Sequence, residues 1–124
     1  MSRQSISHWL RQAMVALAVA IVVVLFVGGA QPEAVNLFLP PVDKLVHAAV
    51  FGLIALLFWF GFNQLGAWEI FWIVVLIGLM DEGHQFFLSG RDADWVDLVT
   101  DFFAAGLVLI LLRLDGEQKL LRRL

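Results

Sequence analysis

The stretch AMVALAVAIVVVLFV, residues 13–27, contains no charged residue. A helix that crosses a bilayer needs about 20 mostly apolar residues, and the apolar character around this stretch extends over about residues 9–27. Gly28, Gly29 and Pro32 follow, and glycine and proline are typical of the end of a helix. The stretch therefore predicts a membrane-spanning helix.

Three further apolar segments, at about residues 42–62, 68–87 and 95–114, have similar lengths. Hydrophobic residues make up 61% of the 124 residues, against roughly 45–50% in a soluble domain. A soluble domain of this size has too little interior to bury so much apolar surface. We therefore expect one all-α domain over residues 1–124, a polytopic membrane protein folded as a four-transmembrane-helix bundle.

The first segment also fits a secretory signal peptide. Arg3 and Arg11 form a basic region, residues 13–27 form an apolar one, and Gly28 and Ala30 are small residues suited to cleavage. The segment is also long enough to span a membrane. The sequence leaves open whether this helix is retained or cleaved.

Composition excludes several chemistries. The chain has no cysteine, so disulfides, thiolate metal sites and cysteine nucleophiles are excluded. Its net charge of −3 argues against a nucleic-acid partner. No recognised metal-ligand spacing is present, so we predict no metal and no cofactor, although the His, Asp and Glu side chains have suitable donor atoms.

Lys and Arg residues predict the orientation, because they are enriched in short cytoplasmic flanks. The outer loops of an even-numbered bundle, residues 28–41 and 88–94, would hold one basic residue, Arg91. The two terminal flanks hold six: Arg3, Arg11, Arg113, Lys119, Arg122 and Arg123. Both termini are therefore predicted to be cytoplasmic.

This topology brings three helix ends to the outer face, and each carries ionisable or amide side chains. We call the predicted set the polar cluster; it comprises Asp43, Lys44, His47, Asp81, Glu82, Gln85, Arg91, Asp97 and Asp101. Residues three or four apart share one side of a helix, as do Asp43 and His47. Asp101 is expected to lie deepest, because an apolar run follows it. A carboxylate at the centre of a membrane helix costs about 2.5–3.5 kcal/mol on insertion scales, so we expect Arg91 to turn inward and pair with an acid.

Simpler interpretations exist for some of these residues. Glu69, Asp92 and Asp94 are better explained as solvated flanks. Asp43 also suits the first turn of a helix, where the helix dipole favours an acid. His47 alone also fits an interfacial histidine. Asp81, Glu82 and Asp101 adjoin long apolar runs, where ionisable residues usually have a function.

Three motifs at these helix ends resemble the VanZ-like family of bacterial membrane proteins. They are Asp43-Lys44 followed by His47, Asp81-Glu82 followed by Gln85, and Arg91 followed by Asp97. Asp101 stands where this family commonly has Asn, and Ala104 where it commonly has Gly. The resemblance covers about residues 40–112. It implies a multi-pass protein of the bacterial inner membrane with a role in the cell envelope, in a family linked to low-level resistance to the antibiotic teicoplanin.

Two functions fit the polar cluster. The first is binding of a lipid head group, a lipid-linked wall precursor or an amphiphilic drug at the outer face. The second is a membrane-embedded hydrolase or transferase in which His47 is a general base oriented by an acid. In both, the expected partners are membrane lipids and a lipid-linked or amphiphilic ligand. A proton or ion pathway is less favoured, because the inner halves of the helices carry few polar residues. The sequence does not decide the oligomeric state.

The predicted topology is tested by reporter fusions. A fusion after Gln64 should report the cytoplasm, and one after Arg91 should report the outside. The opposite result at either position would contradict the orientation.

Overall fold

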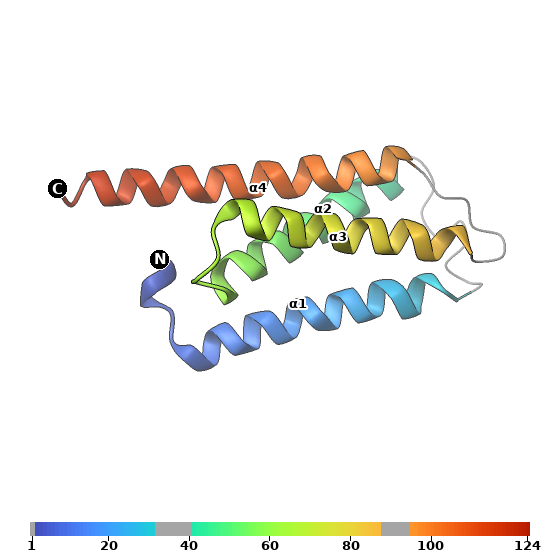
Figure 1. Ribbon diagram of the computed structural model, residues 1–124, viewed down its shortest axis with the longest axis horizontal. Helices are drawn as coiled ribbons and strands as arrows, with labels where there is room; N and C mark the ends of the chain where they lie inside the picture. Colours follow the sequence, from blue (N-terminus) through green and yellow to red (C-terminus); the bar gives the residue numbers. More distant parts are fainter. Residues whose placement is uncertain (1, 32–40, 88–94) are drawn as a thin grey trace.

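The computed structural model describes residues 2–31, 41–87 and 95–124. A short 3-10 helix, Arg3–Ser5, precedes four α-helices: α1 His8–Gly29, α2 Val42–Gly61, α3 Ala67–Phe86 and α4 Trp95–Leu121. No strand occurs within these ranges. The helices run up and down, so that both termini lie at one end of the bundle and the starts of α2 and α4 lie at the other (Figure 1). The expected all-α four-helix bundle is confirmed, whereas the side of the membrane on which the termini lie stays a prediction.

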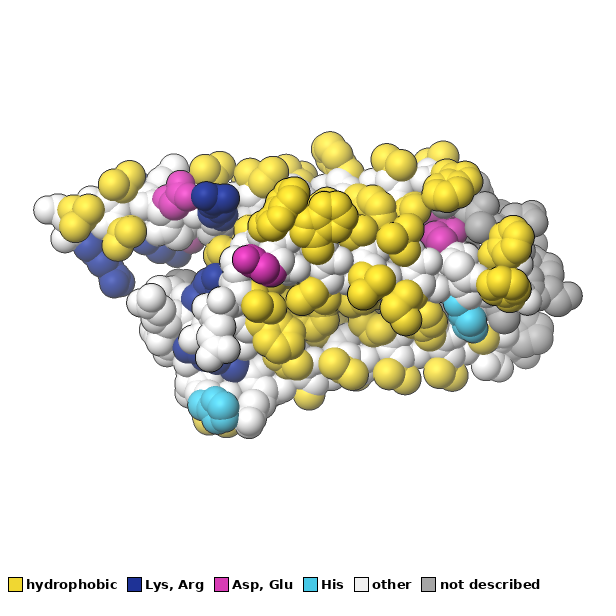
Figure 2. Space-filling model, in the orientation of Figure 1, with side chains coloured by type: hydrophobic (Ala, Val, Ile, Leu, Met, Phe, Trp, Pro, Cys, Tyr) yellow, Lys and Arg dark blue, Asp and Glu magenta, His cyan; other side chains and the backbone are white. Residues whose placement is uncertain are grey.

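The surface between the two ends is apolar. Figure 2 shows hydrophobic side chains covering most of one face, with Lys and Arg gathered at the end that holds the termini. Val24, Trp72, Leu76 and Phe103 are among the exposed large hydrophobic residues. In the described part of the chain, α1, α2 and α4 are long and apolar enough to cross a membrane. α3 has the length of α2 but carries Glu69, Asp81 and Glu82.

The core lies between α2, α3 and α4. Phe51, Ile54, Ile70, Val74 and Leu109 are fully or almost fully buried. α2 packs most extensively on α4 and then on α1. Helix α1 contributes least, since Ala18 is its only buried residue. α2 and α4 are therefore the central pair of the bundle.

Helix α4 is longer than predicted. It continues to Leu121 instead of ending near residue 114, so its 27 residues extend about 40 Å at 1.5 Å per residue. Two ion pairs join successive turns of the added part: Arg113 Nε lies 3.1 Å from Glu117 Oε1, and Lys119 Nζ lies 2.6 Å from Asp115 Oδ2. Such i,i+4 pairs favour an exposed helix, which explains why α4 continues beyond its apolar segment.

Arg3 ties the N-terminal segment to the turn between α2 and α3. Its Nε donates to the carbonyl of Trp59 at 2.7 Å, and its Nη2 donates to the carbonyls of Phe62 and Leu65 at 2.5 and 2.6 Å. The guanidinium also lies 3.8 Å from the centre of the Trp59 ring. The last carbonyls of a helix have no hydrogen-bond donor within the helix. Arg3 supplies such a donor to the carbonyl of Trp59 in the last turn of α2. The sequence suggested only a basic flank here.

Gly61 of α2 lies close against α1. A Cβ atom added at Gly61 would lie 2.5 Å from Val15 Cγ2, whereas one added at Gly83 would meet no atom of the described residues within 4 Å. Valine is stiff about χ1, so Val15 cannot easily move aside. Small residues that let membrane helices approach are a common packing device.

Gly61→Ala should therefore destabilise the protein by about 1–3 kcal/mol through overpacking. The matched change Gly83→Ala should be neutral or stabilising by up to about 1 kcal/mol, because alanine is the better helix former. Unfolding in detergent measures both. Adding Val15→Ala to Gly61→Ala should restore part of the loss; equal effects from the two glycine changes would rule out this close contact.

Candidate functional site

The first turns of α2 and α4 place charged side chains opposite one another. The two helices start at the same end and run in the same direction (Figure 1). Lys44 and His47 are three residues apart on α2, and Asp97 and Asp101 are four apart on α4. Each pair therefore occupies one side of its helix, about one turn apart. The parallel course then matches Lys44 with Asp97 and His47 with Asp101.

Lys44 joins two carboxylates. Its Nζ donates to Asp43 Oδ2 at 3.0 Å and makes a short contact with Asp97 Oδ1. The Lys44 side chain is about a quarter exposed and that of Asp97 is nearly buried. Hydrogen bonds between ionised groups are stronger than neutral ones, so this contact fixes the start of α2 against the start of α4.

His47 lies between the two aspartates of α4. Its Nδ1 is 3.0 Å from Asp101 Oδ1, and its Nε2 is 3.6 Å from Asp97 Oδ2. The ring is also stacked on Phe51, with the ring centres 6.2 Å apart. Only the imidazolium form donates from both ring nitrogens. The two acids and Phe51 together hold the orientation of the imidazole. We call Asp43, Lys44, His47, Asp97 and Asp101 the α2–α4 charge network.

Helix α3 contributes a second buried polar group. Asp81 and Glu82 are buried, and Gln85 Nε2 donates to Asp81 Oδ2 at 3.2 Å. Asp81 lies close enough to His47 and Asp101 to act on both electrostatically. The last turn of α3 therefore adjoins the α2–α4 charge network.

Asp101 is the most deeply buried of these acids. It is fully buried, and its Oδ2 atom has no hydrogen-bond partner among the described residues. Burying a polar atom without a partner costs free energy. Across residues 2–31, 41–87 and 95–124, the buried polar and charged residues are all at this end of the bundle: Asp81, Glu82, Gln85, Asp97 and Asp101. The buried core at the end with the termini is apolar, which argues against a polar path through the membrane.

The structure describes eight of the nine residues of the polar cluster. It joins Asp43, Lys44, His47, Asp97 and Asp101 by direct contacts, and Asp81 with Gln85. Glu82 is buried on α3. Arg91 and its predicted inward pairing lie outside the described residues, as do Asp92 and Asp94. As functional residues, all nine stay a prediction.

Two features of the site region were not anticipated. Phe51 supports the imidazole ring, and its position four residues after His47 is the only sequence signal of that contact. His84 contacts Phe26 of α1, with the ring centres 5.5 Å apart. No group of three or more His, Asp or Glu side chains in the described ranges is arranged to hold a metal ion.

The apolar outer surface, the spanning helices and the buried acids at one end together define a helical membrane protein. The family model described as VanZ/LLP1 matches residues 3–115, almost the whole chain, so the chain belongs to the VanZ/LLP1 family. No curated protein and no solved structure matches it significantly. The family match begins well before residue 40, where the resemblance by motifs began, and so includes α1.

The contact between His47 and Asp101 is tested by a double-mutant cycle. Because this pair is buried, replacing each residue by alanine, singly and together, should give a coupling energy of about 1–3 kcal/mol. The same cycle on the exposed pair Arg113 and Glu117 should give no more than about 0.5 kcal/mol. Unfolding in detergent measures both cycles, and similar coupling energies would contradict the buried pair.

Proposed function

We propose that this VanZ/LLP1 protein is a multi-pass protein of the bacterial inner membrane that binds the polar head of an amphiphilic ligand. The ligand classes are those the sequence favoured: a lipid head group, a lipid-linked wall precursor or an amphiphilic drug such as teicoplanin. The binding site is the α2–α4 charge network together with Asp81, Glu82 and Gln85. A site beside apolar helix surfaces suits a ligand with both a polar head and a hydrocarbon tail.

The observation that carries the proposal is the buried Asp101 carboxylate, which has one oxygen without a hydrogen-bond partner in the described part of the chain. Around it lie Asp97 and the basic side chains of Lys44 and His47, and His47 Nδ1 contacts only the other oxygen of Asp101, Oδ1. Desolvated carboxylates need compensation by a proton, a cation or a hydrogen-bond donor. The site is therefore suited to a head group that donates hydrogen bonds, such as an ammonium group.

A second candidate is the membrane-embedded enzyme. The 3.0 Å contact between His47 Nδ1 and Asp101 Oδ1 has the geometry of a general base and its orienting acid. The other ring nitrogen faces Asp97 at 3.6 Å, so a substrate would have to replace that contact. Mass spectrometry of a lipid probe after incubation with the protein separates the two functions, because only an enzyme converts the probe.

The binding proposal is tested on the purified chain in a neutral detergent. Short-chain phosphatidylethanolamine, whose ammonium group donates hydrogen bonds, should raise the unfolding temperature more than short-chain phosphatidylcholine, whose head group has no N–H donor. Teicoplanin is the probe for binding of an amphiphilic drug. Asp101→Asn should weaken binding about tenfold, the size expected for one hydrogen bond to a charged group.

Glu117→Gln is the matched control, since it removes one carboxylate from the exposed part of α4. It should leave binding unchanged. If neither phosphatidylethanolamine nor teicoplanin binds, the proposed site is wrong. It is also wrong if Asp101→Asn and Glu117→Gln weaken binding equally.

A further inference from the structure

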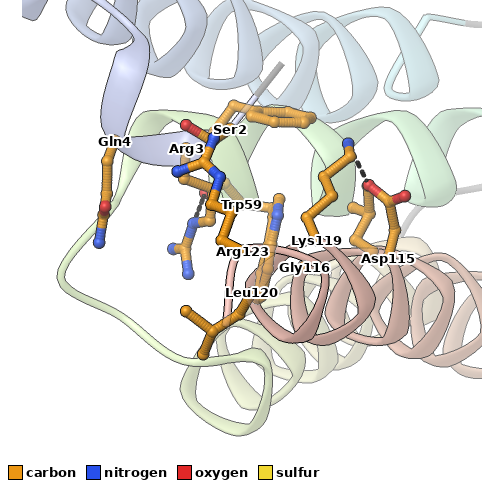
Figure 3. A pocket seen from close by; sticks show the side chains of 11 residues that line it. Ser2, Arg3, Gln4, Trp59, Asp115, Gly116, Lys119, Leu120 and Arg123 are labelled. Atoms are coloured by element: carbon orange, nitrogen blue, oxygen red, sulfur yellow. Dashed lines mark hydrogen bonds and ion pairs between the residues drawn. The ribbon is translucent and has the colours of Figure 1, made fainter.

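A basic pocket lies at the opposite end of the bundle from the α2–α4 charge network. It has a volume of about 250 Å³, and the N-terminal segment, the end of α2 and the last turns of α4 line it (Figure 3). Arg3, Lys119 and Arg123 are its cationic lining residues, and Asp115 is its acidic one. Pockets for drug-sized ligands measure about 300–1,000 Å³, so this pocket suits a smaller group.

The one acidic lining residue of the basic pocket, Asp115, does not balance the charges of Arg3, Lys119 and Arg123. Asp115 is paired with Lys119 at 2.6 Å. Among the described residues, neither Arg3 nor Arg123 forms an ion pair with a carboxylate. Chain ends more than 100 residues apart in sequence thus bring two uncompensated guanidinium groups to one small cavity. Such an arrangement repels itself unless an anion lies between the groups.

Arg3 is held ready for such an anion. Its hydrogen bonds to the carbonyls of Trp59, Phe62 and Leu65 use Nε and Nη2, and the ring of Trp59 fixes its plane. Those bonds occupy three of the five guanidinium donors, and the two on Nη1 stay available. Burial, with the charge of Arg11 as a second cause, lowers the pKa of Arg3. A bound anion would oppose both effects.

The remaining lining indicates where the anion comes from. Trp59, Phe60, Leu112 and Leu120 give the basic pocket an apolar side, and the last turns of α4 extend past its apolar segment. Basic pockets at the ends of membrane helices bind anionic lipid head groups, and arginine matches the geometry of phosphate.

We propose that the basic pocket binds the phosphate of an anionic phospholipid, with Arg3 and Arg123 on the phosphate oxygens and the apolar side against the start of the acyl chains. This site is separate from the proposed outer-face site and does not depend on it.

The test uses the full chain, delipidated in a neutral detergent. Short-chain phosphatidylglycerol, phosphatidylcholine and inorganic phosphate are titrated separately, and Kd is measured by native mass spectrometry and by thermal unfolding. We expect phosphatidylglycerol to bind at least tenfold more tightly than the other two. Equal binding of phosphatidylcholine would overturn the proposal, and equal binding of inorganic phosphate would overturn the assignment to a lipid.

Two variants locate the site. Arg123→Gln removes a pocket charge whose side chain makes no structural hydrogen bond among the described residues, and it should weaken phosphatidylglycerol binding about tenfold. Arg122→Gln removes the same charge from the neighbouring position, which does not line the pocket, and should change Kd less than twofold. Equal losses of affinity in Arg123→Gln and Arg122→Gln would show a diffuse electrostatic attraction, and they would overturn the assignment of binding to the basic pocket. Arg3→Gln should weaken binding too, with thermal unfolding as the check on folding.

Discussion

The burial of Asp97 and Asp101 at the start of α4 is the constraint on which the rest of this structure depends. Acids in an apolar bundle need partners, and α2 supplies them as Lys44 and His47. Because the two helices are parallel, the pairing fixes both their register and their rotation. The same rotation directs Phe51 and Ile54 into the core. Electrostatics at one end and apolar packing along the helices therefore select the same arrangement.

The two ends of the bundle carry opposite excesses of charge. In the described residues, the end with the starts of α2 and α4 has more buried acids than bases, and the end with the termini gathers Lys and Arg (Figure 2). The apolar core between them contains no buried polar side chain among those described. The two ends are therefore chemically separate, and a ligand that suits one does not suit the other. The Lys and Arg residues at the end with the termini also favour one orientation in a membrane, because basic residues are enriched in short cytoplasmic flanks.

The predicted helices agree closely with α1, α2 and α3, because glycine, proline and polar residues flank each apolar segment. Helix α4 continues about seven residues beyond the predicted membrane-spanning segment. Hydropathy reports the spanning part and not the solvated turns that ion pairs such as Asp115 with Lys119 maintain. Spacing also predicts that Asp97 and Asp101, four residues apart, lie on one side of their helix. Spacing does not say which partner each acid takes. The cation observed on Asp97 is Lys44, and the expected pairing of Arg91 lies outside the described residues.

The sequence by itself determined the class of protein, the number of helices and the end of the bundle at which the acids gather. These follow from local quantities: the length of each apolar segment, the residues that end it and the alternating direction of successive helices. The tertiary structure alone decided that His47 lies between Asp97 and Asp101 and that Arg3 reaches the carbonyls of Trp59, Phe62 and Leu65. Those contacts join residues 50 or more positions apart. They depend on the rotation of each helix about its axis, which packing sets and hydropathy does not encode.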